Sequence, residues 1–315
     1  MRMSIKEERI FIDGDVRLGA TIAANDFEGK KPAIVLIMGT GNSDRDGNSR
    51  GFRTDMYKNF AWTFAEWGFV TIRYDKRGTH ESGGKKPLYG FEALVNDAVS
   101  VVEYAKTLPY VDADKVIVFG HSEGGMIASV LSDRTDTAGL MIMGAAGMSM
   151  KDALHFQNWE LAEEAKRTKG FKGFLLRGAS NTEKNNAKID RMFAKASATG
   201  KDKIFISGGI INAKWLREHD AYTAEDLIDK LSAYGKPILA VTGTKDLSAD
   251  YKALDRLSGI PNVECYVPEG VNHIFREVDD DNSVLKVKKQ YARLSKKPVH
   301  KGTEDRMHEW LSQFI

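Results

Sequence analysis

The stretch Gly120-His121-Ser122-Glu123-Gly124 places a serine between two glycines, after the apolar run 116–119 and before an apolar segment with helical spacing. A sharp strand-to-helix turn strains the backbone of its central residue, and flanking glycines tolerate the close approach of neighbouring chains. The free N–H groups that begin the helix can stabilise negative charge developing beside the serine. We therefore interpret Ser122 as a nucleophile; the simpler interpretation is a helix N-cap.

A serine hydroxyl needs a base, and the base needs a group that orients it. His273 follows the apolar run VECYV, and Asp246 stands three residues past Gly243 on the loop after PILAVTG. Together they complete the order serine, acid, histidine that accompanies this serine motif. Asp250 is the alternative acid, with a helix cap as its simpler role. We favour Asp246 because the loop directly after a parallel strand faces the ligand-binding edge of the sheet.

The reaction of a serine with a carbonyl carbon also needs two N–H donors for the developing oxyanion. One is expected to be the amide of Glu123, which follows the serine. The other is expected on the loop Met38-Gly39-Thr40-Gly41, after another apolar run. We assign it to the Thr40 amide, with Gly41 as the near alternative. His121 is interpreted as a packing or hydrogen-bonding residue, because adjacent residues on such a turn point apart.

The sequence around these residues predicts an α/β fold. Residues 8–23 predict two strands joined by a turn at Asp13-Gly14. Beyond them, short apolar runs alternate with amphipathic helical segments, which indicates βαβ crossovers and a mostly parallel central sheet flanked by helices. The expected sheet strands lie at 33–38, 69–74, 116–120, 139–144, 237–243 and 263–267.

One interval breaks this alternation. Residues 151–230 are more charged and more helical, and so long an interval between strands predicts a helical cap inserted over the active-site edge. The remaining segments, 1–150 and 231–315, are expected to form the core. Trp159 and Trp215 are the cap residues that we expect as candidates to line a substrate pocket.

Composition excludes several classes of function. The 315 residues carry 46 basic and 44 acidic side chains, a formal net charge of +2 that favours neither nucleic acid nor membrane partners. No apolar run approaches the ~20 residues of a membrane span, and residues 1–11 lack the apolar core of a signal peptide. The single cysteine, Cys265, cannot form an internal disulfide. We expect a cytoplasmic protein without metal or other cofactor. The sequence leaves the oligomeric state open, a homo-oligomer included.

The same residues carry a family resemblance. The segments 38–48, 72–84, 120–125, 240–247 and 270–275 resemble those of the α/β-hydrolases, and more closely the bacterial serine esterases with a GHSEGG turn. The resemblance implies an esterase that cleaves small-molecule carboxylic esters with small or medium acyl chains, through an acyl-enzyme on Ser122 with Asp246 and His273. Such relatives often carry His-Gly where this chain has Met38-Gly39, and a glycine where it has His80. Met38, Gly39, Gly41 and His80 are therefore further candidates for contact with substrate.

Two other hypotheses remain open. An acyl-CoA thioesterase, an acyltransferase or a peptidase would use the same three residues. The basic segment 284–301 would suit an acyl-CoA substrate, although such runs are usually solvated surface. A non-catalytic protein could also keep this fold to bind a ligand, but the intact Ser122, Asp246 and His273 argue against it.

Overall fold

The central sheet has eight strands and is mostly parallel, as the apolar runs predict. The computed structural model describes residues 4–84, 89–206, 208–278 and 282–315. The strand order is β1-β2-β4-β3-β5-β6-β9-β10, in which β1, β2 and β4 pair antiparallel and all other neighbours pair parallel. The strands are β1 (Lys6–Ile12), β2 (Leu18–Ala24), β3 (Lys31–Ile37), β4 (Val70–Tyr74), β5 (Val111–His121), β6 (Gly139–Met143), β9 (Ile238–Val241) and β10 (Val263–Tyr266).

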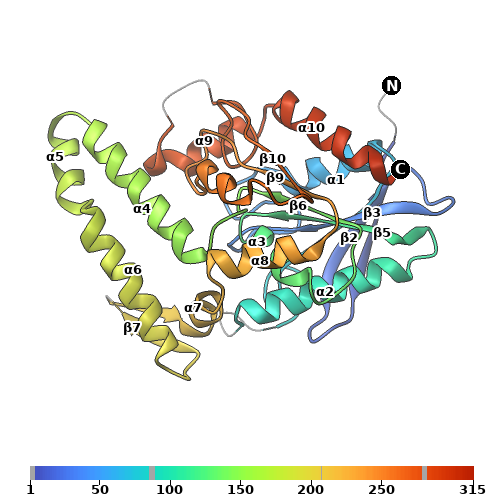
Figure 1. Cartoon of the computed structure of the whole chain (residues 1–315), viewed down its shortest axis with the longest axis horizontal. Coiled ribbons are helices and arrows are strands. Elements are labelled where there is room, and N and C mark those ends of the chain that lie inside the picture. Colours follow the sequence, from blue (N-terminus) through green and yellow to red (C-terminus); the bar gives the residue numbers. More distant parts are fainter. Residues whose placement is uncertain (1–3, 85–88, 207, 279–281) are drawn as a thin grey trace.

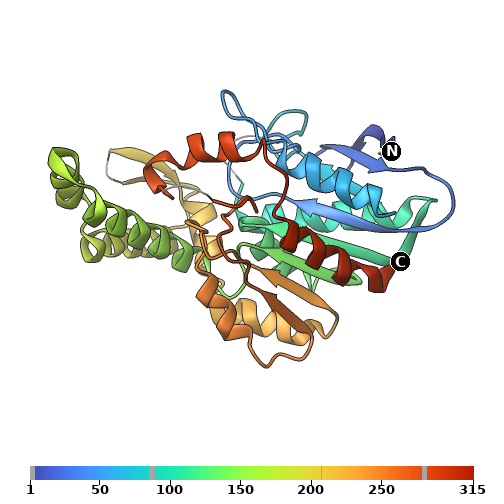
Figure 2. The same cartoon turned by 90° about the horizontal axis from the view of Figure 1, so that it is seen from above.

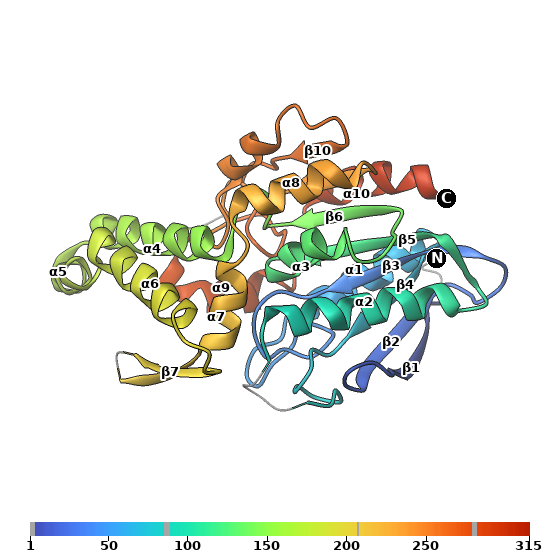
Figure 3. The same cartoon turned by 60° about the horizontal axis from the view of Figure 1, so that its bottom comes forward.

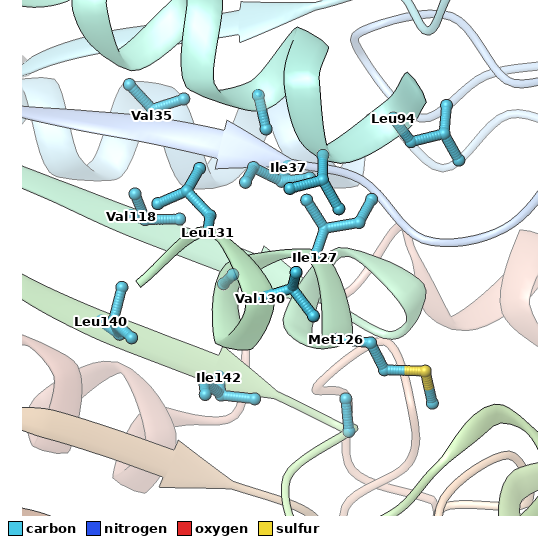
Figure 4. Close-up of a cluster of buried hydrophobic side chains, with 14 of the residues drawn as sticks. Val35, Ile37, Leu94, Val118, Met126, Ile127, Val130, Leu131, Leu140 and Ile142 are labelled. Atoms are coloured by element: carbon cyan, nitrogen blue, oxygen red, sulfur yellow. The ribbon is translucent and has the colours of Figure 1, made fainter. Parts of the chain in front are cut away.

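Helices cover both faces of the sheet. On one face, α2, α3 and α8 bury apolar side chains against the strands, and Figure 4 shows Ile127, Val130 and Leu131 of α3 lying over Val118 and neighbouring strand residues. On the other face, α1 and α10 pack with Phe119 and other strand residues. No helix of the described residues is both long and apolar enough to span a membrane. The bounds are α1 (Met56–Glu66), α2 (Phe91–Thr107), α3 (Glu123–Leu131), α8 (Ala224–Tyr234), α9 (Val287–Leu294) and α10 (Lys301–Leu311), with short 3₁₀ turns at Tyr251–Leu257, Val284–Lys286 and Ser312–Phe314.

The segment between β6 and α8 extends from one end of the sheet, on the side away from both termini (Figures 1 and 2). Its helices form an elongated arm, and the strand β6 points toward it (Figure 3). The elements are α4 (Met150–Arg167), α5 (Gly170–Ala179), α6 (Thr182–Ser197), β7 (Lys203–Ile206), β8 (Gly209–Asn212) and α7 (Ala213–Asp220).

Two features of this segment differ from the helical cap that the sequence predicts. The strands β7 and β8 form a separate antiparallel hairpin, which four-residue runs are too short to indicate by periodicity. Helix α8 packs against α3, and its Leu227 and Leu231 join the core cluster of the sheet. The chain has thus returned to the sheet layer at Ala224, and the boundary expected at residue 230 falls inside α8.

The turn between β5 and α3 is crowded on both sides. A Cβ atom at Gly120 would lie 2.3 Å from the Gly124 carbonyl oxygen, and one at Gly124 would lie 2.1 Å from the Ile37 carbonyl oxygen. Both distances are shorter than any van der Waals contact, and both partners are backbone atoms that cannot rotate away. The two glycines of the motif therefore allow β3, β5 and α3 to pack at one point.

The buried carboxylate of Glu123 joins this turn to the arm. The Glu123 carboxylate accepts from Lys76 Nζ at 2.6 Å, from Trp215 Nε1 at 2.7 Å, and lies 3.2 Å from His219 Nε2. Lys76 follows β4, whereas Trp215 and His219 belong to α7. Burial alone would raise the pKa of Glu123, but Lys76 and His219 outweigh it and hold that pKa well below the ordinary 4.5. The carboxylate is thus ionised and ties α7 to the sheet.

Replacing Gly124 by alanine should destabilise the protein by about 3 kcal/mol, because the new methyl group overlaps the Ile37 carbonyl. Urea unfolding followed by circular dichroism measures the change. Gly178→Ala, inside helix α5, is the matched control, because a Cβ atom there meets nothing within 4 Å. This substitution should increase the free energy of unfolding by at most about 1 kcal/mol. Equal stability of Gly124→Ala and the wild type would contradict the close packing of this turn.

Glu123→Gln should lower the free energy of unfolding by about 3 to 5 kcal/mol at pH 7, because Lys76 is left as an uncompensated buried charge. The folded-state pKa of Glu123 is lowered, so its stabilisation is complete above the unfolded value near 4.5 and declines below it. The difference from the wild type should therefore narrow as the pH falls below 4.5. Glu28→Gln, at an exposed position outside the helices and strands, is the control. Superimposable unfolding curves at pH 7 would refute the pairing.

Candidate active site

Ser122 stands at the point where β5 ends and α3 begins. Its backbone angles are φ 55° and ψ −126°, a region that non-glycine residues rarely adopt. The strain is held by a hydrogen bond from the Ser122 amide to the Met143 carbonyl at 2.9 Å and by the tight glycine contacts. Gly39 approaches from the loop after β3, where a Cβ atom would lie 2.8 Å from the Ser122 Cβ. The serine side chain is therefore presented beside the Gly39 loop.

His273 and Asp246 meet beside this turn. The His273 Nδ1 and Asp246 Oδ2 atoms are 2.7 Å apart, and both residues are buried. The other Asp246 oxygen accepts from the amides of Ser248 at 2.7 Å and Ala249 at 2.9 Å, which fix the carboxylate. An ionised Asp246 requires the proton of the neutral ring to be on Nδ1, which leaves Nε2 as a proton acceptor.

The alternative acid has another role in the fold. Asp250 accepts from the Lys252 amide at 3.0 Å and is the N-cap of the turn Tyr251–Leu257. Its carboxylate thus satisfies a backbone donor at the start of that turn. The hydrogen bond to His273 is made by Asp246.

A hydrogen-bond chain that the sequence did not reveal links the Gly39 loop to His273. The Gly39 amide donates to the Tyr57 hydroxyl oxygen, Tyr57 contacts His121 Nδ1, and His121 Nε2 reaches the His273 carbonyl, each at 2.9 Å. The carbonyl can only accept, so the His121 proton is on Nε2, and Nδ1 accepts from Tyr57. Burial, and then the neighbouring His273, lower the pKa of His121 well below 6.5, so the His121 ring stays neutral.

Two backbone amides beside Ser122 remain available. The Gly39 amide is occupied by Tyr57, whereas the next amide, that of Thr40, has no hydrogen-bond partner among the described residues. The Glu123 amide begins α3 and so has no partner within that helix. These are the two donors that the sequence singles out. Gly41 follows with φ 126°, a conformation that favours glycine.

Ser122 and His273 open into one cavity of about 490 Å³. Its walls come from the Gly39 loop, from residues 47–57, from the arm helices α4 and α7, and from α9. Among the candidates for contact with substrate, Gly39, Gly41 and Trp215 line it, together with Thr40. Other residues of its lining are Phe52, Tyr57, Met150, Leu154, Gln157, Ser248, Ile274, Lys288 and Tyr291.

Three candidates lie elsewhere. Met38 is buried in the core, and His80 is exposed, with its ring 3.1 Å from the Asn42 carbonyl oxygen. Trp159 lines a neighbouring cavity of about 690 Å³, which Asp246 also borders. Met38 directly precedes Gly39, which lines the Ser122 cavity, but Met38 itself packs in the core.

The structure also adds residues that sequence reasoning missed. Tyr57 lies on the apolar face of α1, where helical periodicity gives it no distinction from its buried neighbours. Lys288 and Tyr291 lie in a basic run that is typical of solvated surface. The described residues hold no group of three or more His, Cys, Asp or Glu side chains arranged to bind a metal ion.

Comparison with known proteins agrees with this arrangement. The chain is 24% identical over 276 residues to Esterase EstD of Thermotoga maritima, a match that covers 86% of this chain and 60% of the esterase. It thus spans less than two thirds of that relative's length.

Solved structures with the same fold include Est1E from Butyrivibrio proteoclasticus with bound ferulic acid and the Pyrococcus furiosus esterase Pf2001. Est1E has a TM-score of 0.56 and 21% identity, over 90% of this chain and 96% of Est1E. Pf2001 has a TM-score of 0.56 and 13% identity, over 99% of this chain and 94% of Pf2001.

The family model Hydrolase_4, described as serine aminopeptidase, S33, matches residues 50–266, more than half of the chain and including the Ser122 turn and Asp246. The sheet order, the strained serine turn and this match agree. The chain therefore belongs to the Hydrolase_4 family of α/β-hydrolases.

Proposed function

We propose that this protein is a serine hydrolase that cleaves carboxylic esters of small or medium acyl chains through an acyl-enzyme on Ser122. The observation that carries the proposal is the 2.7 Å contact between Asp246 and a His273 ring that shares a cavity with the strained Ser122. A base oriented by a buried carboxylate is the arrangement that activates a serine hydroxyl.

In the proposed reaction, Ser122 Oγ attacks the ester carbonyl carbon and His273 Nε2 takes the hydroxyl proton. The amides of Thr40 and Glu123 stabilise the oxyanion, and each such donor typically contributes about 10²- to 10³-fold to the rate. The intermediate collapses, the C–O bond to the alcohol breaks, and His273 returns the proton to the leaving oxygen. A water molecule, deprotonated by His273, then hydrolyses the acyl-enzyme.

The hydrogen-bond chain from the Gly39 amide to the His273 carbonyl gives Tyr57 and His121 positioning roles in the proposed reaction. Because Tyr57 occupies the Gly39 amide, the loop is held with the Thr40 amide free. The same chain ends on the His273 backbone, so the oxyanion loop and the base are held to one another. Such fixed donors need no rearrangement when charge develops.

The size and chemistry of the cavity support a small ester as the substrate. A volume of about 490 Å³ fits a small or medium acyl group, and apart from Lys288 its walls mix apolar and neutral polar side chains. EstD and Pf2001 are named esterases, which supports the same class of substrate here.

The family description suggests a peptidase as the second candidate. An aminopeptidase has to bind a substrate ammonium group, for which a carboxylate is the usual partner. Among the described residues that line the Ser122 cavity, none is Asp or Glu. The lining therefore favours esters over peptides with a free amino terminus.

Ser122→Ala and His273→Ala should each lower kcat/KM by about 10⁴-fold or more, and the double variant should lose little beyond either, because the residues act as a unit. Hydrolysis of p-nitrophenyl acetate, butyrate and longer esters measures this. A fluorophosphonate should label the wild type and leave Ser122→Ala unlabelled. Ser100→Ala, on the exposed side of α2, serves as the control. Undiminished turnover by Ser122→Ala would refute the proposal.

Asp246→Asn should lower kcat by about 10³- to 10⁴-fold, because the amide no longer holds the proton of the ring on Nδ1. Asp250→Asn should keep kcat within a factor of about three and cost at most about 1 kcal/mol of stability, since its side chain only caps a turn. Kinetics and thermal unfolding of the two matched variants separate these effects. The reverse order of the two losses in kcat would assign the acid to Asp250.

A further inference from the structure

Helix α9 contributes two side chains to the Ser122 cavity, Lys288 and Tyr291. They are three residues apart and so lie one above the other on the same face of the helix. Lys288 is exposed as well as lining the cavity, so the residue lies where the cavity meets solvent. Among the described residues that line the cavity, it is the one side chain with a permanent charge. The structure pairs it with no carboxylate among the residues that it describes.

The Tyr291 hydroxyl is the second unusual group. It is buried and the Ser248 side chain lies close to it, but no hydrogen bond of normal geometry satisfies it among the described residues. A buried hydroxyl without a partner is costly, and in a binding cavity it indicates a position where a ligand atom completes the bond. Burial, and then the charge of Asp246, raise the pKa of Tyr291, so the group stays protonated and can donate. The Asp246 carboxylate itself is already occupied by His273 and two amides.

An ammonium group and a phenolic hydroxyl on one wall of an otherwise uncharged cavity are donors that suit a carboxylate. We propose that Lys288 and Tyr291 form a subsite for a carboxylate group on the substrate. The preferred esters then carry a free carboxylate, either on the acyl group, as in hemiesters of dicarboxylic acids, or on the alcohol. This inference rests on the proposed ester hydrolysis and names its substrate class.

Other lysines of the basic segment do not share this position. Lys286 borders a different cavity, with Glu160, Glu164 and Arg167. Lys289, the next residue along α9, is exposed and does not line the Ser122 cavity. The pair Lys288 and Lys289 therefore offers a matched comparison in which net charge and helix composition change equally.

The test measures kcat/KM for two pairs of esters that differ only in one negative charge. p-Nitrophenyl hemiglutarate and its methyl ester carry or lack the charge on the acyl side, whereas 4-carboxyphenyl acetate and its methyl ester carry or lack it on the alcohol side. Lys288→Met should lower kcat/KM for the charged ester of one pair by about 5- to 10-fold, mainly through KM, and leave its neutral counterpart within twofold. The affected pair identifies the side that the subsite recognises.

Further variants sharpen the result. Lys288→Glu should reverse the preference between the charged and neutral esters, and 1 M salt should weaken the preference of the wild type. Tyr291→Phe should raise KM for the same charged ester while the unfolding temperature stays near that of the wild type. Lys289→Met should behave as the wild type does. Equal effects of Lys288→Met and Lys289→Met, or no effect of Lys288→Met on either charged ester, would overturn the subsite.

A binding measurement separates failure of the subsite from failure of the proposed reaction. Calorimetric titration of Ser122→Ala with glutarate needs no turnover, and the added substitution Lys288→Met should weaken binding by about 5- to 10-fold. If neutral esters are hydrolysed but glutarate binds equally with and without Lys288, the subsite alone is wrong. If no ester is hydrolysed in a Ser122-dependent manner, the proposed reaction itself fails.

Discussion

The strained, positive-φ backbone of Ser122 is the constraint on which the rest of the site depends. A non-glycine residue keeps such a conformation only where its surroundings prevent relaxation. Here β3 and α3 approach each other through Gly124, and the Gly39 loop lies against the serine itself. The same contacts that hold the strain bring the Thr40 amide beside the serine. Presenting the side chain and forming the proposed oxyanion site therefore depend on the same packing.

Two polar connections then join the parts that this packing leaves separate. Glu123 connects the turn to α7 of the arm through Trp215 and His219, and Lys76 compensates its charge. Tyr57 and His121 connect the Gly39 loop to the His273 backbone. Buried networks of this kind are costly when any member is missing, and they fix one arrangement when complete.

Apolar runs predict six of the sheet strands. Five of them, β3, β4, β5, β6 and β9, contain runs buried on both faces, which leave a plain pattern in the sequence, whereas β10 is only partly buried. The contact between Asp246 and His273 also agrees with residue order and loop position. The hairpin β7–β8 could not be predicted, because its strands are four residues long and partly exposed. Lys288 and Tyr291 could not be distinguished from surface residues, since only the packing of α9 against the cavity gives them a role. Conversely, the sequence proposed Met38, His80 and Trp159 as substrate contacts, but none of them lines the Ser122 cavity.

The place of β6 in the sheet has a consequence for synthesis of the protein. β6 pairs with β5 on one side and with β9 on the other, yet the whole arm lies between β6 and β9 in the sequence. In a nascent chain, one edge of β6 therefore stays unpaired until the arm has been translated, although every residue of β6 is buried in the folded protein. At about 5 to 20 residues per second, that interval lasts on the order of ten seconds. The arm thus delays closure of the sheet, and a partly made chain is exposed to edge-to-edge association during that time.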